Sequence, residues 1–192
     1  MLQARGLMLQ VPGRTLCRDL AFSVQPGECW GVLGNNGSGK TTLIQALGGL
    51  KAPAAGGITL EGRALNGFGR RELARRIGVL LQDEAQGFWG SVLEYVLLGR
   101  HPHAKAVFGW LPEDEAAAAW ALERMDLAGV AGRSLNTLSG GERQRARIAQ
   151  LLAQGPQYLL LDEPLQHLDL RHQFEAMELL CGLAASDGKA LV

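Results

Sequence analysis

Hydrophobic residues follow two different spacings in the two parts of the chain. The N-terminal part has short runs typical of β-strands: residues 16–24 alternate imperfectly, residues 58–60 form a short β-branched segment, and residues 77–81 are continuously apolar. We predict turns where glycine follows proline or alanine, at Pro12-Gly13, Pro26-Gly27 and Ala55-Gly56-Gly57. This part of the chain is therefore predicted to be rich in strands.

Beyond Gln82 the pattern becomes helical. Residues 91–98 have helical spacing, and Pro112 with three acidic residues after it marks a helix start that residues 116–125 continue. The chain is therefore predicted to form one α/β domain with a strand-rich core and a helical insertion. The predicted core consists of residues 1–82 and 156–192, and the insertion runs from about 83 to 155.

The first candidate site is the run GNNGSGKTT, which matches the phosphate-loop pattern G-x-x-x-x-G-K-[ST]. The apolar residues 29–33 predict a strand before it, and Leu43, Ile44 and Leu47 predict a helix after it. The glycines let backbone N–H groups approach a polyphosphate, and the helix adds its positive dipole end. We predict that ATP binds to Gly34, Asn35, Asn36, Gly37, Ser38, Gly39, Lys40, Thr41 and Thr42.

Two side chains of this loop have the chemistry that a nucleoside triphosphate requires. Lys40 can bridge the β- and γ-phosphates, and the Thr41 hydroxyl can coordinate Mg²⁺. A glycine-rich turn with a chance Lys-Thr pair is the alternative. The flanking strand and helix patterns argue against it.

A second helix start follows Ser139, which is a good N-cap residue. Gly140 and Gly141 remove side chains from the approach to this helix, which is predicted to end at Gly155-Pro156. Its N-terminus can accept an anion. Because one ATP needs only one phosphate loop, we predict that this site serves a nucleotide held by another copy of the chain.

A third cluster consists of two carboxylates after a buried strand. Residues 158–161 are predicted to form the strand, and Asp162 and Glu163 follow it. Acidic side chains at the carboxyl end of a strand lie where ligands bind in open α/β sheets. Asp162 is then placed to hold the Mg²⁺ shell, and Glu163 to polarise the water that attacks the γ-phosphate.

The composition disfavours several classes of protein. Lys plus Arg and Asp plus Glu balance at 19 each, so no bulk charge favours a nucleic-acid partner. No apolar stretch reaches about 18 residues, so we do not expect the chain to cross a membrane by itself. The odd, scattered cysteines predict reduced thiols in the core: Cys17, Cys29 and Cys181.

With these clusters the chain resembles the nucleotide-binding subunits of ATP-binding cassette (ABC) transporters. The resemblance rests on the phosphate loop, the signature LSGGERQR at 138–145, the strand YLLLDEP at 158–164, the glutamine loop from Gln82 and the D-loop at 167–169. It implies a P-loop NTPase core with a mixed sheet, an antiparallel β subdomain and an inserted α-helical subdomain.

The resemblance also implies an assembly and a role for each motif. Two ATP molecules would lie in a head-to-tail homodimer, each between one protomer's phosphate loop and the other's signature helix. The implied signature contacts are Ser139, Gly140, Gly141 and Glu142, and Asp169 would communicate across the dimer. The implied catalytic residues are Glu163, Gln82 and Asp162, and the implied Mg²⁺ residues are Thr41, Gln82 and Asp162.

Within the family, residues 91–103 and 169–173 look like those of importers of metal chelates such as iron-siderophore, haem or cobalamin. This similarity implies membrane permease subunits as partners, indirectly a substrate-binding protein, and a peripheral location on the cytoplasmic face of the inner membrane. Phe88 and Trp89 either form local core or contact the permease, and both alternatives stay open. His101 and His103 could be metal ligands, but a structural role is favoured.

The chain departs from the family pattern in two places. Residues 9–14 contain no aromatic residue to stack on adenine, so Val11 or Arg14 would take that role, and Phe22 and Trp30 are assigned to the core. The sequence also stops at Val192, within the strand that should precede the switch histidine. The resemblance therefore implies a truncated chain with low turnover.

Three functions remain open at this point. The leading one is the motor ATPase of an importer. A soluble cassette ATPase acting on DNA or ribosomes would need a long coiled coil between Gln82 and Leu138, or a second cassette, and the sequence has neither. The third is a nucleotide-binding module that does not turn over because of the truncation.

Overall fold

The computed structural model describes residues 1–82, 87–105 and 109–192, which divide into two compact units. The first unit contains residues 1–79, 157–162 and 181–192, and the second contains residues 80–156 and 163–180. The predicted helical insertion falls within the second unit, although its residues 83–86 and 106–108 lie outside the described part of the chain. The division into core and insertion stays a prediction.

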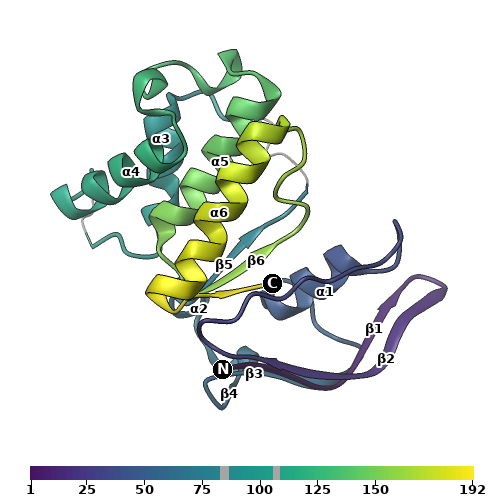
Figure 1. The fold of residues 1–192 in the computed structure, drawn as a ribbon. Helices are drawn as coiled ribbons and strands as arrows, with labels where there is room; N and C mark the ends of the chain where they lie inside the picture. Colours follow the sequence, from purple (N-terminus) through teal and green to yellow (C-terminus); the bar gives the residue numbers. More distant parts are fainter. Residues whose placement is uncertain (83–86, 106–108) are drawn as a thin grey trace. The chain divides into compact units, whose positions relative to one another are not determined.

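An antiparallel sheet forms one part of the first unit, with strand order β2-β1-β3-β4 (Figure 1). Buried residues alternate along the beginning of β1, where Leu2 and Ala4 face the core, and Leu7 and Leu9 continue the buried side after a register shift. The predicted Pro12-Gly13 turn joins the first two strands. The strands are β1 (Leu2–Val11), β2 (Arg14–Val24), β3 (Ala55–Leu60) and β4 (Arg63–Ala64), followed by η1 (Leu65–Gly67) and α2 (Arg70–Ala74).

The predicted turn at Ala55-Gly56-Gly57 is wrong, because these residues belong to β3. The glycines serve a close approach between strands rather than a reversal of the chain. Gly56 has φ +79°, and a Cβ on it would lie 2.2 Å from the carbonyl oxygen of Gly6. The register between β1 and β3 shifts at this point, between Arg5 and Met8. The glycine pair therefore indicates a β-bulge and not a turn.

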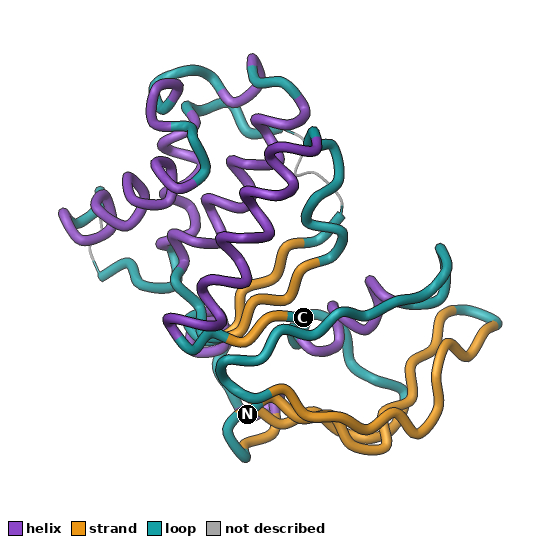
Figure 2. Tube along the Cα trace, viewed as in Figure 1, coloured by secondary structure: helices purple, strands orange, loops and turns teal. Residues whose placement is uncertain are grey.

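The second sheet consists of β5 (Ile77–Leu80), β6 (Tyr158–Leu161) and β7 (Ala190–Leu191), in that order (Figure 2). β6 and β7 run parallel, and the first three side chains of β6 are buried. Helix α1 (Lys40–Leu47) ends at Gly48, where a Cβ would lie 2.7 Å from Cγ2 of Val79. Glycine at the end of this helix is therefore a packing requirement.

The predicted strand over residues 29–33 is wrong. Only Cys29 forms a parallel bridge, with Leu191, and the Trp30 N–H donates to the Leu191 carbonyl at 2.9 Å. Leu33 is 96% exposed. Three core assignments are wrong. In this segment Trp30 is exposed, although its ring lies 6.0 Å from that of Phe22, and Cys29 is exposed as well. Cys181, in α6, is also exposed.

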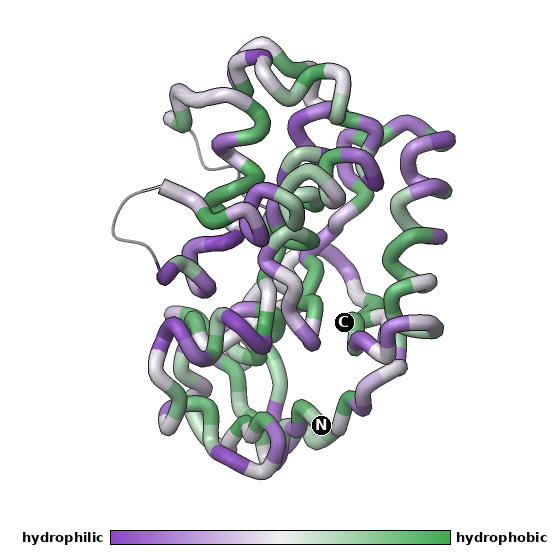
Figure 3. The backbone as a smooth tube through the Cα atoms, turned by 90° about the vertical axis from the view of Figure 1, so that its left-hand side faces the viewer, coloured by the Kyte–Doolittle hydropathy of each residue, from purple (hydrophilic) through white to green (hydrophobic). Residues whose placement is uncertain are grey.

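Helices form the second unit, in which α3, α4 and α5 pack against one another. Hydrophobic and hydrophilic residues are interleaved along the helices (Figure 3). The predicted helix at 91–98 is α3, and the predicted start at Pro112 begins α4. The elements are α3 (Val92–Leu97), η2 (Leu98–Arg100), α4 (Pro112–Arg124), η3 (Ala128–Val130), η4 (Leu135–Thr137), α5 (Gly140–Gln154) and α6 (Leu170–Asp187), of which residues 181–187 belong to the first unit.

A buried ion pair joins the start of α4 to the end of η2. Arg100 Nε donates to Asp114 Oδ1 at 2.8 Å, and the Leu111 N–H donates to Oδ2 at 3.2 Å. Burial acts to raise the pKa of Asp114, but these hydrogen bonds and the Arg100 charge hold the pKa below its usual value. Because the folded-state pKa is lowered, this contribution to stability is present at neutral pH and is lost as pH falls through the folded-state pKa.

Replacing Asp114 with asparagine should lower the free energy of unfolding by about 3 kcal/mol, because it leaves Arg100 without its buried counter-charge. Urea denaturation followed by circular dichroism measures this loss. The matched control is Glu113→Gln in the same helix turn, where an exposed pair with Lys105 at 3.7 Å should contribute less than about 1 kcal/mol. Equal losses in the two variants would contradict the prediction.

Candidate functional site

The phosphate loop lies in the first unit and leads into α1. Gly39 is the N-cap of this helix, has φ +107°, and provides no side-chain cap for the first N–H groups. The ammonium of Lys40 donates to the carbonyl oxygens of Gly34 and Asn35, at 2.8 and 3.3 Å. The loop therefore folds around the Lys40 side chain, next to uncapped helix N–H groups that can bind an anion.

Two glycines of the loop leave room for neighbouring side chains. A Cβ on Gly34 would lie 2.7 Å from Oγ of Ser38, and a Cβ on Gly39 would lie 3.0 Å from Cδ1 of Leu16. Gly39 also has a left-handed backbone that other residues rarely adopt. Leu16 was not predicted from the sequence as part of this site, because only its position on β2 brings it to the loop.

Asp162 follows β6 in the same unit and is only 4% exposed. Its Oδ2 atom is buried and has no hydrogen-bond partner among the described residues. A buried carboxylate oxygen without a donor is costly unless something else satisfies it. Such an oxygen is suited to bind an Mg²⁺ ion or one of its water ligands. The Thr41 hydroxyl, in the first turn of α1, is another oxygen ligand of the kind that Mg²⁺ prefers.

The second unit brings together two of the predicted catalytic residues. Gln82 Nε2 donates to Glu163 Oε2 at 3.4 Å, although the two residues are 81 positions apart in the sequence. Glu163 has a left-handed backbone with φ +50°. A carboxylate held by an amide donor is suited to orient and polarise a water molecule.

The signature residues cap α5 as predicted. The Glu142 N–H donates to Ser139 Oγ at 3.2 Å, and the Ser139 N–H donates to Glu142 Oε2 at 2.8 Å, which is a capping box. The bonds from Ser139 lower the pKa of Glu142. A Cβ on Gly141 would lie 3.4 Å from the His167 carbonyl oxygen, an ordinary contact distance, so the helix start lies close to the D-loop.

Asp169 of the D-loop caps the start of α6. Its Oδ1 accepts from the His172 N–H at 2.9 Å, and His172 Nδ1 lies 2.9 Å from both carboxylate oxygens. The backbone hydrogen bond, then the side-chain bond, lower the pKa of Asp169. The carboxylate is therefore ionised at neutral pH and stays exposed at the protein surface.

The sequence pattern of the ABC transporter family matches residues 17–166 of this chain. The chain belongs to this family. It is an ATP-binding cassette, the ATP-hydrolysing domain that gives the family its name.

Curated members of the ABC family are similar along nearly the whole chain. The hemin import ATP-binding protein HmuV of Myxococcus xanthus is 41% identical, over 99% of this chain and 73% of its own length. The ferric enterobactin transport ATP-binding protein FepC of Escherichia coli is 38% identical, over 99% of this chain and 70% of its own length. The cobalamin import ATP-binding protein BtuD of Halobacterium salinarum is 38% identical, over 100% of this chain and 48% of its own length.

Solved ABC structures confirm the predicted α/β cassette fold. An inward-facing structure described as a metal-chelate type ABC transporter has a TM-score of 0.82 and 32% identity, covering 100% of this chain and 70% of that one. The cassette MJ0796, in a dimeric post-hydrolysis state with ADP and Pi, has a TM-score of 0.85 and 27% identity. The match covers 100% of this chain and 86% of that one.

Phe88 and Trp89 of the cassette differ in how far their side chains are exposed. The Phe88 ring packs edge-on against Tyr95 with centroids 5.4 Å apart, and the Asn136 side chain donates to the Phe88 carbonyl at 3.1 Å. The Trp89 side chain is 87% exposed. Phe88 is therefore part of the local packing, and Trp89 presents a large apolar ring at the surface.

The two histidines after η2 are held by structural contacts. The His101 ring packs edge-on against Trp110 with centroids 5.4 Å apart, and His103 Nε2 lies 2.9 Å from the Gln154 carbonyl oxygen. Within the described ranges, no group of three or more His, Cys, Asp or Glu side chains could hold a metal ion. These contacts favour the structural role.

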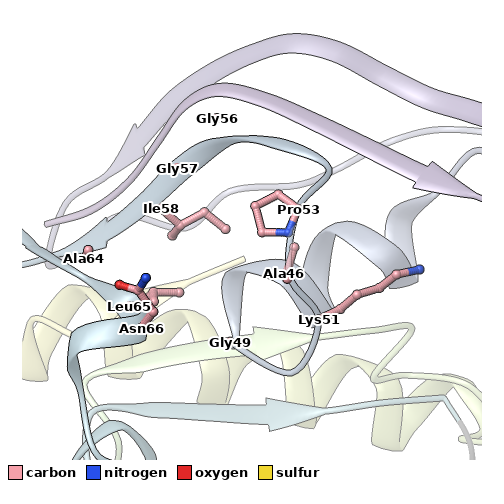
Figure 4. Close-up of a pocket in the computed structure, with 11 residues that line it drawn as sticks. Ala46, Gly49, Lys51, Pro53, Gly56, Gly57, Ile58, Ala64, Leu65 and Asn66 are labelled. Carbon is pink, nitrogen blue, oxygen red and sulfur yellow. The ribbon is translucent and has the colours of Figure 1, made fainter.

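A cavity of about 390 Å³ lies at the opposite end of α1 from the phosphate loop (Figure 4). Figure 4 shows Ile58 and Pro53 facing it, and the Lys51 side chain extends away from Ile58. Its lining consists of Ala46, Gly49, Lys51, Ala52, Pro53, Gly56, Gly57, Ile58, Ala64, Leu65 and Asn66, none of which belongs to the predicted ATP site.

Val11 and Arg14, predicted to hold adenine, pair across the β1–β2 turn, and that role stays a prediction.

Proposed function

We propose that this cassette powers an importer of a metal chelate such as haem, a ferric siderophore or cobalamin. The observation that carries the ATP-hydrolysing part of the proposal is the contact between Gln82 and Glu163, which places an amide and a carboxylate suited to water activation in one unit. The names of HmuV, FepC and BtuD support the class of cargo. The phosphate loop with its enclosed Lys40 supplies the nucleotide site.

In this proposal the chain binds ATP with Mg²⁺. Residues 34–42 hold the phosphates through backbone N–H groups and the Lys40 ammonium, while Thr41, Gln82 and Asp162 hold the ion. Mg²⁺, when bound, neutralises charge on the β- and γ-phosphates. Glu163 orients the attacking water and accepts its proton, and Gln82 holds the Glu163 carboxylate in place.

We further propose a homodimer in which each ATP is shared. Ser139, Gly140, Gly141 and Glu142 of one protomer contact the ATP bound to the other, and Asp169 communicates between the protomers. The start of α5 supports this arrangement, because Gly140 and Gly141 give it a helix terminus that can accept an anion, separate from the phosphate loop. The dimeric state of MJ0796 supports it as well.

Permease subunits are the proposed membrane partners, and a substrate-binding protein delivers the cargo to them. Among the described residues, no helix has the length and apolar character needed to span a bilayer. We propose that the cassette lies at the cytoplasmic face of the inner membrane and is held there by its permease. The exposed Trp89 ring supports such a contact surface, since aromatic residues anchor many interfaces.

The cargo class can be tested in liposomes that contain the cassette and its permease. We expect one of three chelates, haem, a ferric catecholate siderophore or cobalamin, to stimulate ATP hydrolysis when added with its binding protein. Stimulation by none of the three would contradict the cargo proposal and leave the ATPase assignment intact.

Replacing Trp89 with alanine should reduce co-purification with the permease by roughly tenfold, because an anchoring aromatic ring is lost from the interface. Quantitative pull-down measures the effect. Trp120→Ala in α4 is the matched control, since that ring is also partly exposed and lies elsewhere on the helical unit. If both variants retain the permease equally well, Trp89 does not contribute to docking.

A further inference from the structure

Helix α5 carries a buried arginine that the predicted motifs do not use. Arg147 is only 8% exposed and lies between the fully buried residues Ala146 and Ile148. Its Nη1 donates to Gln144 Oε1 at 2.8 Å, and its Nη2 donates to the Leu81 carbonyl oxygen. The planar guanidinium serves both acceptors at once, which a lysine ammonium does less well.

Gln144, which accepts from Arg147, also binds the backbone of a second loop. The Gln144 side chain is 4% exposed, and its Nε2 donates to the Pro164 carbonyl oxygen at 2.7 Å. Buried side-chain hydrogen bonds to backbone carbonyls fix the position of the backbone more firmly than exposed ones. Arg147 and Gln144 therefore hold two backbone segments against the same helix.

Both anchored carbonyls belong to neighbours of the candidate catalytic residues. Leu81 precedes Gln82, Pro164 follows Glu163, and the side chains of Gln82 and Glu163 meet at 3.4 Å. The contacts form a closed ring, from Arg147 through Leu81 and Gln82 to Glu163, and back through Pro164 and Gln144. All six residues lie in the second unit.

We infer that Arg147, acting with Gln144, is a positioning residue that sets the distance between Gln82 and Glu163. This inference rests on the proposed roles of those two residues in ATP hydrolysis. A buried charge is costly, and an apolar side chain would pack at position 147 with less desolvation, so its contacts rather than its packing explain it. Arg147 is not itself a catalytic residue.

The kinetic test compares Arg147→Met with the parent cassette. Loss of the guanidinium should lower kcat about tenfold, because small misplacements of reacting groups slow catalysis strongly, while KM for ATP changes less than about twofold. Arg147→Lys should recover part of kcat. The control is Gln150→Met, which removes another hydrogen bond from α5, to the Tyr95 carbonyl at 3.0 Å, and should keep kcat unchanged.

A double-mutant cycle separates positioning from general damage. If Arg147 acts through Gln82, then Arg147→Met should add little to the loss caused by Gln82→Ala. Losses that simply multiply would contradict positioning, as would an equal fall of kcat in Arg147→Met and Gln150→Met.

A second measurement does not depend on activity. Labelling leucine carbonyl carbons with ¹³C and glutamine nitrogens with ¹⁵N gives NMR signals only from Leu-Gln peptide bonds, which begin at Leu2, Leu9, Leu81 and Leu165. Arg147→Met should shift the Leu81 signal, Arg147→Lys should shift it less, and Gln150→Met should leave it in place. An unshifted Leu81 signal in Arg147→Met would overturn the inference.

The two proposals fail in distinguishable ways. If the parent cassette hydrolyses no ATP and Glu163→Gln changes nothing, the proposed function fails, and the Leu81 signal still tests the contact of Arg147. If Glu163→Gln stops hydrolysis but Arg147→Met keeps kcat, only the positioning role fails.

Discussion

Replacing Lys40 with alanine will weaken ATP binding by at least about a hundredfold. The Lys40 ammonium lies within the phosphate loop, where it donates to the carbonyl oxygens of Gly34 and Asn35. A charge-assisted hydrogen bond to a phosphate is worth about twice a neutral one, and no other cation is positioned in the loop residues 34–42. Isothermal titration calorimetry with Mg²⁺ and ATP measures the loss.

The matched control for Lys40 is Lys51→Ala. Lys51 lies beyond the opposite end of α1, beside the cavity shown in Figure 4, and carries the same charge. Its removal should change the ATP affinity less than about twofold, since screened charges at a distance contribute little. Equal affinity of Lys40→Ala and the parent would remove Lys40 from the nucleotide site.

Glu163→Gln will abolish ATP turnover, with a loss of about a thousandfold or more, while ATP binding stays intact. The amide has the shape of the carboxylate and can still accept the hydrogen bond from Gln82 Nε2. It cannot accept a proton from water, and general-base catalysis contributes about 100- to 10,000-fold. Because ATP then persists at the shared sites, the variant should accumulate as an ATP-bound dimer.

Phosphate release measures the turnover of Glu163→Gln, and light scattering coupled to size exclusion measures its mass with and without ATP. Glu175→Gln is the control, because that carboxylate pairs with Arg171 on the surface of α6. Unchanged turnover in Glu163→Gln would exclude Glu163 as the base. A variant that stays monomeric with ATP would contradict the proposed sharing of sites.

Elements whose limits depend on local residues were predictable from the sequence. The capping box of Ser139 and Glu142 starts α5 where the pattern places it, and Gly155, with φ +66°, ends it. Pro112 starts α4 for a similar reason, since its fixed φ suits the first helical position. These signals act within one helical turn and need no knowledge of the rest of the chain.

Features that depend on distant partners were not predictable. The apolar residues 29–33 have strand character, but a strand needs a paired neighbour, and only Cys29 forms a bridge, with Leu191. Ala55-Gly56-Gly57 looks like a turn because the approach of Gly6 cannot be read locally. Arg147 lies 66 positions from the Leu81 carbonyl that it binds, so its burial had no local signal.

Two residues near the candidate chemistry make the chain less stable than it could be. Glu163 and His167 have left-handed backbones, with φ +50° and +66°, and such conformations cost about 1–3 kcal/mol each for residues with a Cβ. Glycine at either position would relieve this strain. At position 163, however, glycine would remove the carboxylate that the proposed chemistry requires, so under the proposed function a gain in stability there would cost activity.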